Sequence, residues 1–353
     1  MDLVKQSIEI ILRGQSNTGA YIACPNFKSY QYSWFRDGAF IAYAMDRVGE
    51  AESANLFHSW VFTTLSKKQD VMRRVVEKRA QHQTLQMQDY LHTRYTMKGK
   101  TGGEEWPNHQ LDGFGTWLWA LVEHQKEIRQ DLPQKWRPTM INLANYLISL
   151  WDQPCYDCWE EFPDSIHPYT LASIYAGLTA CQTLTGVDYS KTLKAIKQLV
   201  YQQAAPQGYF VKSIGSDLVD SSLLGLSIPY DLVDHDDPRM LATKSRIEAD
   251  LYHGAGVKRY AQDTYYGGGD WVLLAAWKGW YDVLNGEHQK AENVRAWIES
   301  AANLSGQLPE QVPLTLNEPS YYQYWVERWG EIATPLLWSH AMYLILMNAL
   351  GEC

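Results

Sequence analysis

The sequence predicts an all-α protein, and two observations carry this prediction. Apolar residues recur with helical period in almost every long segment, whereas the alternation typical of a strand is scarce. In addition, no stretch rich in proline, glycine or serine separates one group of helices from another. The length of 353 residues alone permits two or three domains. A long series of helices without a linker instead predicts one all-α domain over residues 1–353, built either as a solenoid or as a closed ring of helical hairpins.

The predicted helices follow one another along the whole chain. Leu3, Ile8 and Leu12 lie on one helical face, and Gly14 ends that first helix. The segment most like a strand is 209–212, which reads Tyr-Phe-Val-Lys. The other helices are predicted over residues 39–48, 53–65, 111–123, 138–151, 168–185, 189–202, 238–252, 270–284, 288–302 and 335–350.

The connections between these helices are of two kinds. Some are short, such as 49–50 and 186–187. The others are long and rich in aromatic, acidic and glycine residues, and a ring of hairpins would place them on one rim, where function usually resides. These long connections are 19–37, 96–110, 155–168, 254–269 and 306–333.

The composition excludes several classes of protein. A net charge of −9 without a basic block argues against nucleic-acid binding, which needs clustered lysine and arginine. The longest apolar runs, 271–277 and 342–347, are much shorter than the roughly 18 residues of a membrane span. The 15 Trp and 23 Tyr exceed what a core requires. We therefore expect a small-molecule ligand, no nucleic acid and no membrane; no oligomeric state follows from the sequence.

The N-terminus and the cysteines predict a cytoplasmic protein. The first residues lack the basic region, the long apolar stretch and the cleavage site of a signal peptide. Five cysteines form an odd and sparse set, which is not a disulfide framework. Cys155 and Cys158 have CxxC spacing, but no second CxxC and no paired HxxxH accompany them. We therefore expect neither a metal nor a cofactor, and a reduced cysteine pair beside a functional loop.

The segment 30–38 predicts a sugar contact. Arg36 and Asp37 stand at the start of a predicted helix, where such a pair often forms only a surface ion pair and a helix cap. Here Tyr30 and Trp34 accompany them. An acid and a guanidinium can bind adjacent hydroxyls while aromatic carbon covers the C–H face of a sugar ring.

Two further segments carry candidate catalytic acids. Glu160 and Glu161 follow Trp159, and desolvation by such a ring can raise the pKa of one carboxyl group so that it acts as a general acid. Glu310 stands between apolar neighbours and Pro309. Each motif alone also fits an exposed turn. Together they supply the two carboxylates that glycoside hydrolysis requires.

Three more segments combine aromatic and polar residues. The segment 259–271 contains Arg259, Tyr265 and a run of glycines, but it lacks the lysine and the spacing of a phosphate-binding loop. We interpret it as a turn that lets a ligand approach the backbone. Trp106 and Trp338 stand beside polar groups at helix starts, and His340 is interpreted as structural.

Taken together, these motifs resemble the catalytic domain of glycoside hydrolase family 15, the glucoamylase family. They occur in the order found in that family and cover nearly the whole chain. The matching segments are Tyr-Ser-Trp-Phe-Arg-Asp-Gly (32–38), Gln-Leu-Asp-Gly-Phe-Gly (110–115), Trp-Glu-Glu (159–161), Arg-Tyr-Ala-Gln-Asp-Thr-Tyr-Tyr-Gly-Gly (259–268), Leu-Pro-Glu-Gln-Val (308–312) and Ala-Thr-Pro-Leu-Leu-Trp-Ser-His-Ala (333–341).

The resemblance implies an (α/α)6 barrel and exo-acting hydrolysis of α-glucosidic bonds with inversion, which releases β-glucose. Glu160 matches the general acid of the family and Glu310 its general base. The residues expected to bind substrate are Tyr30, Trp34, Arg36, Asp37, Trp106, Gln110, Asp112, Trp159, Glu161, Arg259, Tyr265 and Trp338.

The sequence departs from the common family layout, because neither a β-sandwich domain before the barrel nor a starch-binding module after it is expected here. We therefore expect soluble oligosaccharides with α-1,4 or α-1,6 linkages as substrates, or trehalose. One alternative is a catalytically silent barrel that binds glycans or regulates a partner, which the presence of both Glu160 and Glu310 disfavours. Another is a sugar isomerase or epimerase, which typically needs paired histidines that these loops lack.

Overall fold

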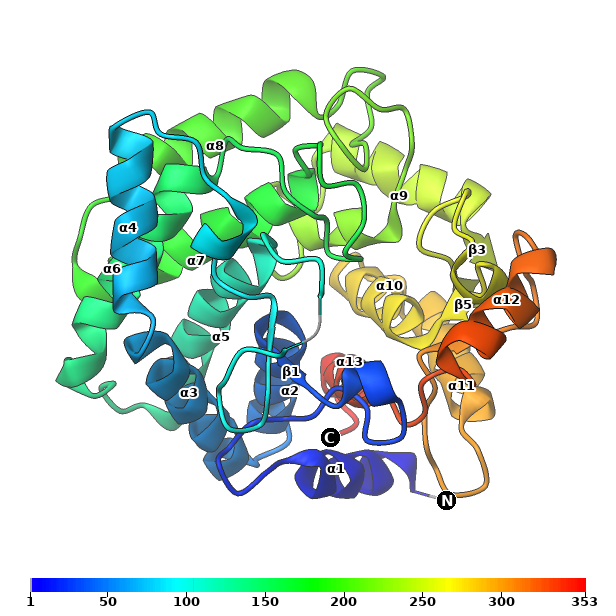
Figure 1. The fold of residues 1–353 in the computed structure, drawn as a ribbon. Helices are drawn as coiled ribbons and strands as arrows, with labels where there is room; N and C mark the ends of the chain where they lie inside the picture. The colour runs from blue at the N-terminus through cyan, green and yellow to red at the C-terminus, as the bar shows by residue number, and fades with distance from the viewer. Residues whose placement is uncertain (1, 104) are drawn as a thin grey trace.

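The computed structural model describes residues 2–103 and 105–353, and its helices form a closed ring in two layers (Figure 1). Around the inner layer each segment packs against the next, and the last packs against the first. The prediction of an (α/α)6 barrel is therefore confirmed. The inner segments, in order, are α2 (Phe35–Arg47), α5 (Asp112–Ile128), α7 (Pro168–Thr185), η4 (Ser221–Leu226), α10 (Val272–Leu284) and α13 (Leu337–Leu350).

An outer helix precedes each inner segment in the chain, so that the layers alternate around the described ring. α11 packs on α10, α3 on α2, and α1 on α13. The outer helices are α1 (Leu3–Gly14), α3 (Ala51–Ser66), α6 (Arg137–Leu150), α8 (Ser190–Gln203), α9 (Pro238–Asp250) and α11 (His288–Ala301).

The inner helices are buried on nearly every side, as their sequences require. In α13 the first eleven residues, from Leu337 to Met347, are all buried. α5 and α7 approach so closely that side chains are excluded between them. A Cβ atom on Gly115 would lie 2.3 Å from the carbonyl oxygen of Ser173, and one on Gly177 would lie 2.6 Å from the Cα of Gly115. Glycine at these two positions lets the inner helices pack backbone to backbone.

The fourth inner segment differs from the others. η4 is a 3-10 helix of six residues, all of them buried. The chain before it includes 209–212, the segment most like a strand in the sequence, which forms no strand. The amide of Phe210 donates to the hydroxyl of Thr243 (2.8 Å), and the amide of Val211 donates to the carbonyl of Ala204 (2.9 Å). These groups bind a helix and a turn, so no strand ladder forms there.

The strands of the described chain are short antiparallel pairs within the loops. β1 (Ser33–Trp34) pairs with β2 (Arg94–Tyr95). β3 (Tyr252–His253) pairs with β4 (Gly256–Val257), and β5 (Asp270–Trp271) pairs with β6 (Gln311–Val312). The first and the last of these pairs each join two long loops that are far apart in sequence.

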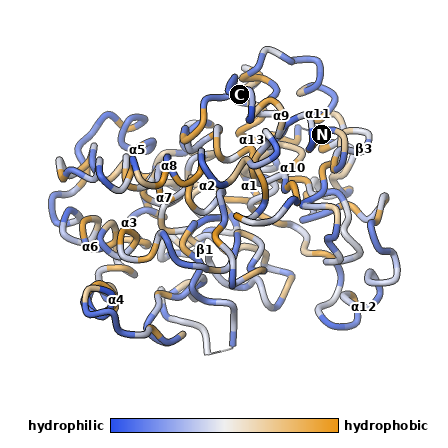
Figure 2. Tube along the Cα trace, turned by 90° about the horizontal axis from the view of Figure 1, so that it is seen from above, coloured by the Kyte–Doolittle hydropathy of each residue, from blue (hydrophilic) through white to orange (hydrophobic). Residues whose placement is uncertain are grey.

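Two helices lie outside the predicted set, α4 (Gln69–Ala80) and α12 (Ser320–Trp329). In Figure 2, α4 lies at the edge of the molecule and is coloured mainly as hydrophilic. Only Met72 and Val75 of α4 are buried, and no residue of α12 is. Neither helix buries a wide apolar face in the core, and neither was recognised from the sequence. No helix among the described residues is long and apolar enough to cross a membrane.

Candidate active site

A cavity of about 460 Å³ opens where the inner helices begin. Its lining comes from the N-terminal ends of α2, α10 and α13 and from the long loops between them. The prediction that these loops meet on one rim therefore agrees with the structure. The predicted residues that line the cavity are Tyr30, Trp34, Arg36, Asp37, Trp106, Trp159, Glu160, Glu161, Arg259, Tyr265, Glu310 and Trp338.

The first turn of α2 supplies a buried ion pair. Arg36 and Asp37 are 6% and 7% exposed, and Arg36 Nη2 lies 3.4 Å from Asp37 Oδ2. Arg36 also lies over the ring of Trp338, with its Cζ 5.2 Å from the ring centroid. Burial raises the pKa of Asp37 to about 6, although Arg36 opposes the shift. Both side chains reach the cavity, so a sugar hydroxyl can meet a donor and an acceptor side by side.

Gln110 and Asp112 do not line the cavity; they hold Arg36 from behind. Arg36 Nη1 donates to Gln110 Oε1 (3.1 Å) and to Asp112 Oδ2 (3.2 Å). Asp112 is fully buried at the start of α5. Because the guanidinium lies in front of them, these two predicted residues orient a binding group and have no open path to a ligand.

Glu160 stands in a tight turn stabilised by Asp157. The Oδ1 atom of Asp157 accepts hydrogen bonds from the amides of Trp159 (2.9 Å) and Glu161 (2.8 Å). Glu160 itself has a φ of 66°, a left-handed conformation that a residue other than glycine rarely adopts. Such strain persists only where the surroundings enforce it, and here it directs the side chain into the cavity.

The carboxyl group of Glu160 accepts a hydrogen bond and has a raised pKa. Trp34 Nε1 donates to its Oε1 at 2.6 Å. Burial raises the pKa of Glu160 to about 7, against the opposing effects of Arg36 and of this hydrogen bond. A carboxyl group with this pKa is protonated in a large fraction of molecules near neutral pH.

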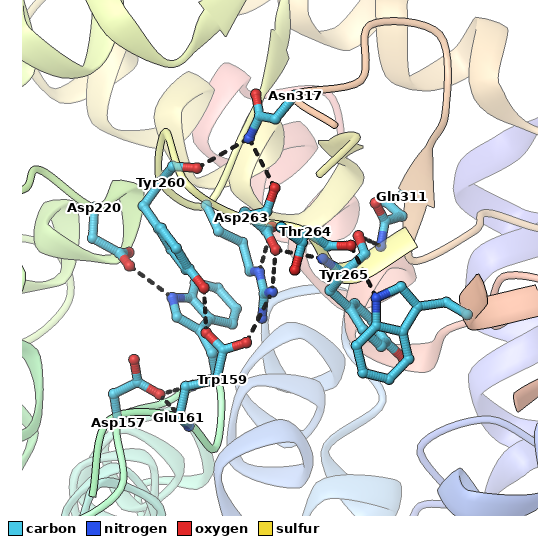
Figure 3. A network of polar contacts seen from close by, with 12 residues as sticks. Asp157, Trp159, Glu161, Asp220, Tyr260, Asp263, Thr264, Tyr265, Gln311 and Asn317 are labelled. Atoms are coloured by element: carbon cyan, nitrogen blue, oxygen red, sulfur yellow. Dashed lines mark hydrogen bonds and ion pairs between the residues drawn. The ribbon is translucent and has the colours of Figure 1, made fainter. Parts of the chain in front are cut away.

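A buried lysine that the sequence did not single out supports this turn. Lys212 Nζ lies 2.7 Å from Asp157 Oδ2 and 2.6 Å from Asp220 Oδ2. Asp220 in turn accepts from the indole nitrogen of Trp159 at 2.9 Å (Figure 3). One ammonium group thus joins the turn that carries Glu160 to the chain before η4. Lys212 belongs to the segment 209–212, which was considered only for its likeness to a strand, so this lysine was not recognised as part of the site.

Glu161 belongs to a second network on the other side of the turn. Arg259 Nη2 lies 3.3 Å from Glu161 Oε1, and the hydroxyl of Tyr260 donates to Oε2 at 2.6 Å (Figure 3). Arg259 Nε also donates to Asp263 Oδ2 at 2.7 Å. The guanidinium of Arg259 is thereby fixed between two carboxylates while it still lines the cavity.

Glu310 is held through both its backbone and its side chain. Its amide donates to the carbonyl of Ala333 (2.9 Å), and its carbonyl accepts from the amide of Val272 (3.2 Å). The hydroxyl of Tyr30 donates to Glu310 Oε1 at 3.0 Å, whereas Oε2 has no hydrogen-bond partner among the described residues. Burial raises the pKa of Glu310 to about 8, and the bond from Tyr30 opposes the shift. Glu310 Oε2 is the atom left to accept a proton from a ligand or water.

Comparison with known proteins identifies the family at this point. The model of glycosyl hydrolases family 15 matches residues 1–308. The chain belongs to glycoside hydrolase family 15. Glu310 lies just beyond the matched residues, so its assignment depends on the geometry of the cavity.

Similar proteins support this membership. An isomaltose glucohydrolase of Kribbella flavida is 39% identical over 99% of this chain and 93% of its own. A solved glycosidase variant in complex with glucose has a TM-score of 0.96 at 38% identity, covering 99% of this chain and 96% of its own. A trehalase of Sulfolobus acidocaldarius is 30% identical over 44% of this chain and 28% of its own. This family 15 protein is a glycoside hydrolase.

The cavity of this family 15 hydrolase has a wall that the sequence prediction missed. α12 contributes Trp325, Arg328 and Trp329 to the lining. The signal was present as the aromatic-rich sequence Ser-Tyr-Tyr-Gln-Tyr-Trp-Val-Glu-Arg-Trp. It was assigned to the loop 306–333, because aromatic residues were taken there as a mark of the long connections. Further lining residues outside the prediction are Ala23, Phe27, Ser29, Glu105, Pro107, Cys158, Trp271, Leu273 and Leu336.

The potential metal ligands of the described chain cluster away from the cavity. One group is Asp46, His58 and His124, and another is Glu248, Asp282 and Glu287. None of these residues lines the cavity. Cys155 and Cys158 are free and buried, and burial raises the pKa of the Cys158 thiol well above its usual range. The chemistry available at the lining is therefore that of carboxyl groups, guanidinium groups and aromatic rings.

Proposed function

We propose that this protein is an inverting, exo-acting α-glucosidase that releases β-glucose from the non-reducing end of soluble α-gluco-oligosaccharides. The observation that carries the proposal is that Glu160 and Glu310 line one cavity together with the Arg36–Asp37 pair. Two carboxyl groups around one sugar site are what acid–base hydrolysis of a glycoside requires. The volume of about 460 Å³ falls within the range of small-ligand sites.

Glu160 acts as the general acid in this proposal. Its carboxyl group donates a proton to the glycosidic oxygen as the bond to the anomeric carbon breaks. The pKa of about 7 keeps the proton available, and Trp34 fixes the direction of the carboxyl group through its bond to Oε1. The leaving sugar departs as a neutral alcohol.

Glu310 acts as the general base. In its ionised form it takes a proton from a water molecule that attacks the anomeric carbon from the opposite face, which inverts the configuration. The hydroxyl of Tyr30 and the charge of Arg259 favour the ionised form against the burial that raises the pKa to about 8. Since this pKa lies above that of Glu160, the active form, with Glu160 protonated and Glu310 ionised, is a minor fraction of the molecules and is most populated between pH 7 and pH 8. Because Tyr30 uses its proton for Glu310, its contact of 3.1 Å with the hydroxyl of Tyr265 makes Tyr265 the donor to Tyr30.

We propose isomaltose-type α-1,6 linkages as the preferred substrates. The support is the similarity over nearly the whole length to the isomaltose glucohydrolase of Kribbella flavida. A trehalase-type activity is the second candidate, because a trehalase matches part of the chain, but that match covers less than half of it.

A panel of disaccharides tests the proposal. Glucose release is measured from isomaltose, maltose, nigerose, kojibiose and trehalose, and proton NMR follows the anomer formed first. We expect the highest kcat/KM on isomaltose and β-glucose as the first product. Trehalose as the best substrate would establish the trehalase-type alternative. α-Glucose as the first product would exclude inversion, and no release from any sugar would favour a silent, glycan-binding barrel.

A further inference from the structure

α12 is an unusual helix for the surface of this protein. Five of its ten residues are aromatic, yet none of the ten is buried. Tyr321, Tyr324 and Trp329 are 45%, 48% and 37% exposed. Exposed aromatic surface that adjoins a cavity marks a binding site more often than a solvated face. The question is which ligand covers these rings.

α12 rests on η5 (Tyr265–Gly267), which connects it to the catalytic residues. The indole nitrogen of Trp325 donates to the carbonyl of Thr264 at 2.9 Å, and its ring lies 5.1 Å from that of Tyr265. The hydroxyl of Tyr266 donates to the carbonyl of Gly330 at 2.7 Å. Figure 3 shows Tyr265 and Thr264 beside the network that includes Asp263. The helix is thus held at a defined place at the mouth of the cavity.

The rings of α12 form a continuous row that leaves the cavity. Trp325, Arg328 and Trp329 line the cavity, and the Cζ atom of Arg328 lies 5.4 Å from the ring centroids of both tryptophans. Arg328 Nη1 also donates to the hydroxyl of Tyr324 at 2.9 Å. The ring of Tyr321 lies 6.3 Å from that of Tyr324. Spacings of three and four residues place these side chains on the same face of the helix.

We propose that α12 binds the leaving-group side of the substrate: Trp325, Arg328 and Trp329 hold the sugar next to the cleaved bond, and Tyr321 and Tyr324 hold the sugar after it. This inference rests on the proposed function. Aromatic carbon covers the C–H faces of these sugars, and the guanidinium donates to their hydroxyls.

The gradient of burial supports this placement. An exo-acting enzyme holds the terminal glucose deepest, and the deep residues here are Arg36 and Asp37, both less than 10% exposed. The units that follow the cleaved bond must pass the mouth, where Trp329 is 37% exposed. Because the residues of α12 are more exposed than Arg36 and Asp37, the inference places them against those later units. Its continuity with the cavity favours sugar over a second copy of the chain as the occupant.

Three substrates of increasing length separate the roles. α-Glucosyl fluoride occupies only the glucose site, isomaltose adds one sugar, and isomaltotriose adds two. Turnover of α-glucosyl fluoride by the unaltered protein tests the proposed function by itself. The inference on α12 is then read from the ratio of kcat/KM between substrates, so the two can fail separately.

The expected effects follow from the row of contacts. Trp329→Ala should lower kcat/KM about tenfold on isomaltose and isomaltotriose and leave α-glucosyl fluoride within twofold, since only the leaving-group sugar loses its contact. Tyr324→Ala should lower kcat/KM about threefold to tenfold on isomaltotriose alone. Gln323→Ala is the matched control, because Gln323 is exposed on the same helix and lies outside the cavity lining.

Two results would overturn the inference on α12. One is an equal loss on all three substrates by Trp329→Ala with unchanged circular dichroism, which would place the ring at the glucose site. The other is no change beyond twofold on any substrate in either variant. If sedimentation also showed that these variants lose a dimer that the Gln323→Ala control retains, a second copy of the chain would be the occupant.

Discussion

The side chains at the bottom of the cavity and those of the wall formed by α12 are held in place by different physical means. At the bottom, Arg36, Asp37 and Glu310 are between 2% and 7% exposed, and buried polar partners hold each of them. In α12, Trp329 is 37% exposed, and its ring is contacted by the guanidinium of Arg328. The bottom is an electrostatic site fixed before a ligand arrives, whereas the wall offers apolar area that a ligand covers.

This difference predicts a graded response to substitution. Removal of one partner from a buried, hydrogen-bonded group leaves the other unsatisfied, which costs more free energy than the contact itself contributes. An exposed ring that is truncated leaves only solvent behind. Substitutions at the bottom should therefore affect every substrate and often the stability of the fold, and substitutions in α12 should affect only substrates that reach it.

The largest effect is expected from Glu310→Gln. Without a base, turnover of both isomaltose and α-glucosyl fluoride should fall by about 10³-fold, within the range for general base catalysis, while the circular dichroism spectrum is retained. Initial rates of glucose and fluoride release measure the loss. The exposed Glu331 is the matched acid, and Glu331→Gln should keep nearly full activity. Near-normal hydrolysis by Glu310→Gln would remove Glu310 from the role of base.

Lys212→Met should give the next largest effect, on stability. The buried ammonium neutralises Asp157 and Asp220, and its loss leaves two carboxylates without a counter-charge beneath the turn of Glu160. Breaking such a buried pair costs about 3 kcal/mol of unfolding free energy. Urea unfolding measures this, with the exposed Lys191→Met as the control. A loss below about 1 kcal/mol would show that the network contributes little.

Arg36→Lys should lower kcat/KM by about 100-fold, because one ammonium cannot replace a planar group that faces three partners. Arg36 contacts Gln110, Asp112 and Asp37 at once. The loss should be the same on isomaltose and α-glucosyl fluoride, unlike that of Trp329→Ala. A loss confined to isomaltose would contradict the assignment of Arg36 to the terminal glucose.

The same contrast explains what the sequence predicted. The long inner helices were predicted because their apolar residues recur with helical period. η4 was not predicted, since a segment of six residues is too short to show such a period. The helix α12 was missed for the related reason that it buries no residue. Apolar periodicity therefore predicted the long helices that bury one face. It did not predict a short buried segment such as η4, or a helix such as α12 that contacts η5 and buries none of its residues.

Short sequence motifs predicted the residues that line the cavity, but not the residues that hold them in place. Glu160 and Arg36 stand within contiguous motifs that combine aromatic and polar residues, which made them visible. Lys212 and Asp220 reach the turn of Glu160 from 55 and 61 positions along the chain. No local signal records such a pairing. Gln110 and Asp112 lie in a visible motif, but only the fold shows that they stand behind Arg36.

The smallest effect concerns the pH dependence of the unfolding free energy. It would show how far the buried Glu310 lowers the stability of the fold. Burial raises the pKa of Glu310 to about 8. Between the ordinary pKa of glutamate, about 4.3, and this value, the folded state binds a proton that the unfolded state has released. The stability that this proton contributes is present at low pH and is lost as the pH rises toward 8.

Glu310→Gln removes that titration. The unfolding free energy of the variant relative to the unaltered protein should therefore increase from pH 6.5 to pH 8, by on the order of 1–2 kcal/mol. Urea unfolding at several pH values measures the difference, and Trp329→Ala, which changes no titrating group, should show a constant one. A difference for Glu310→Gln that stays flat or falls with pH would mean that Glu310 is ionised at little cost in the folded protein. The residues at the bottom of the cavity would then lower the unfolding free energy no more than those of α12 do.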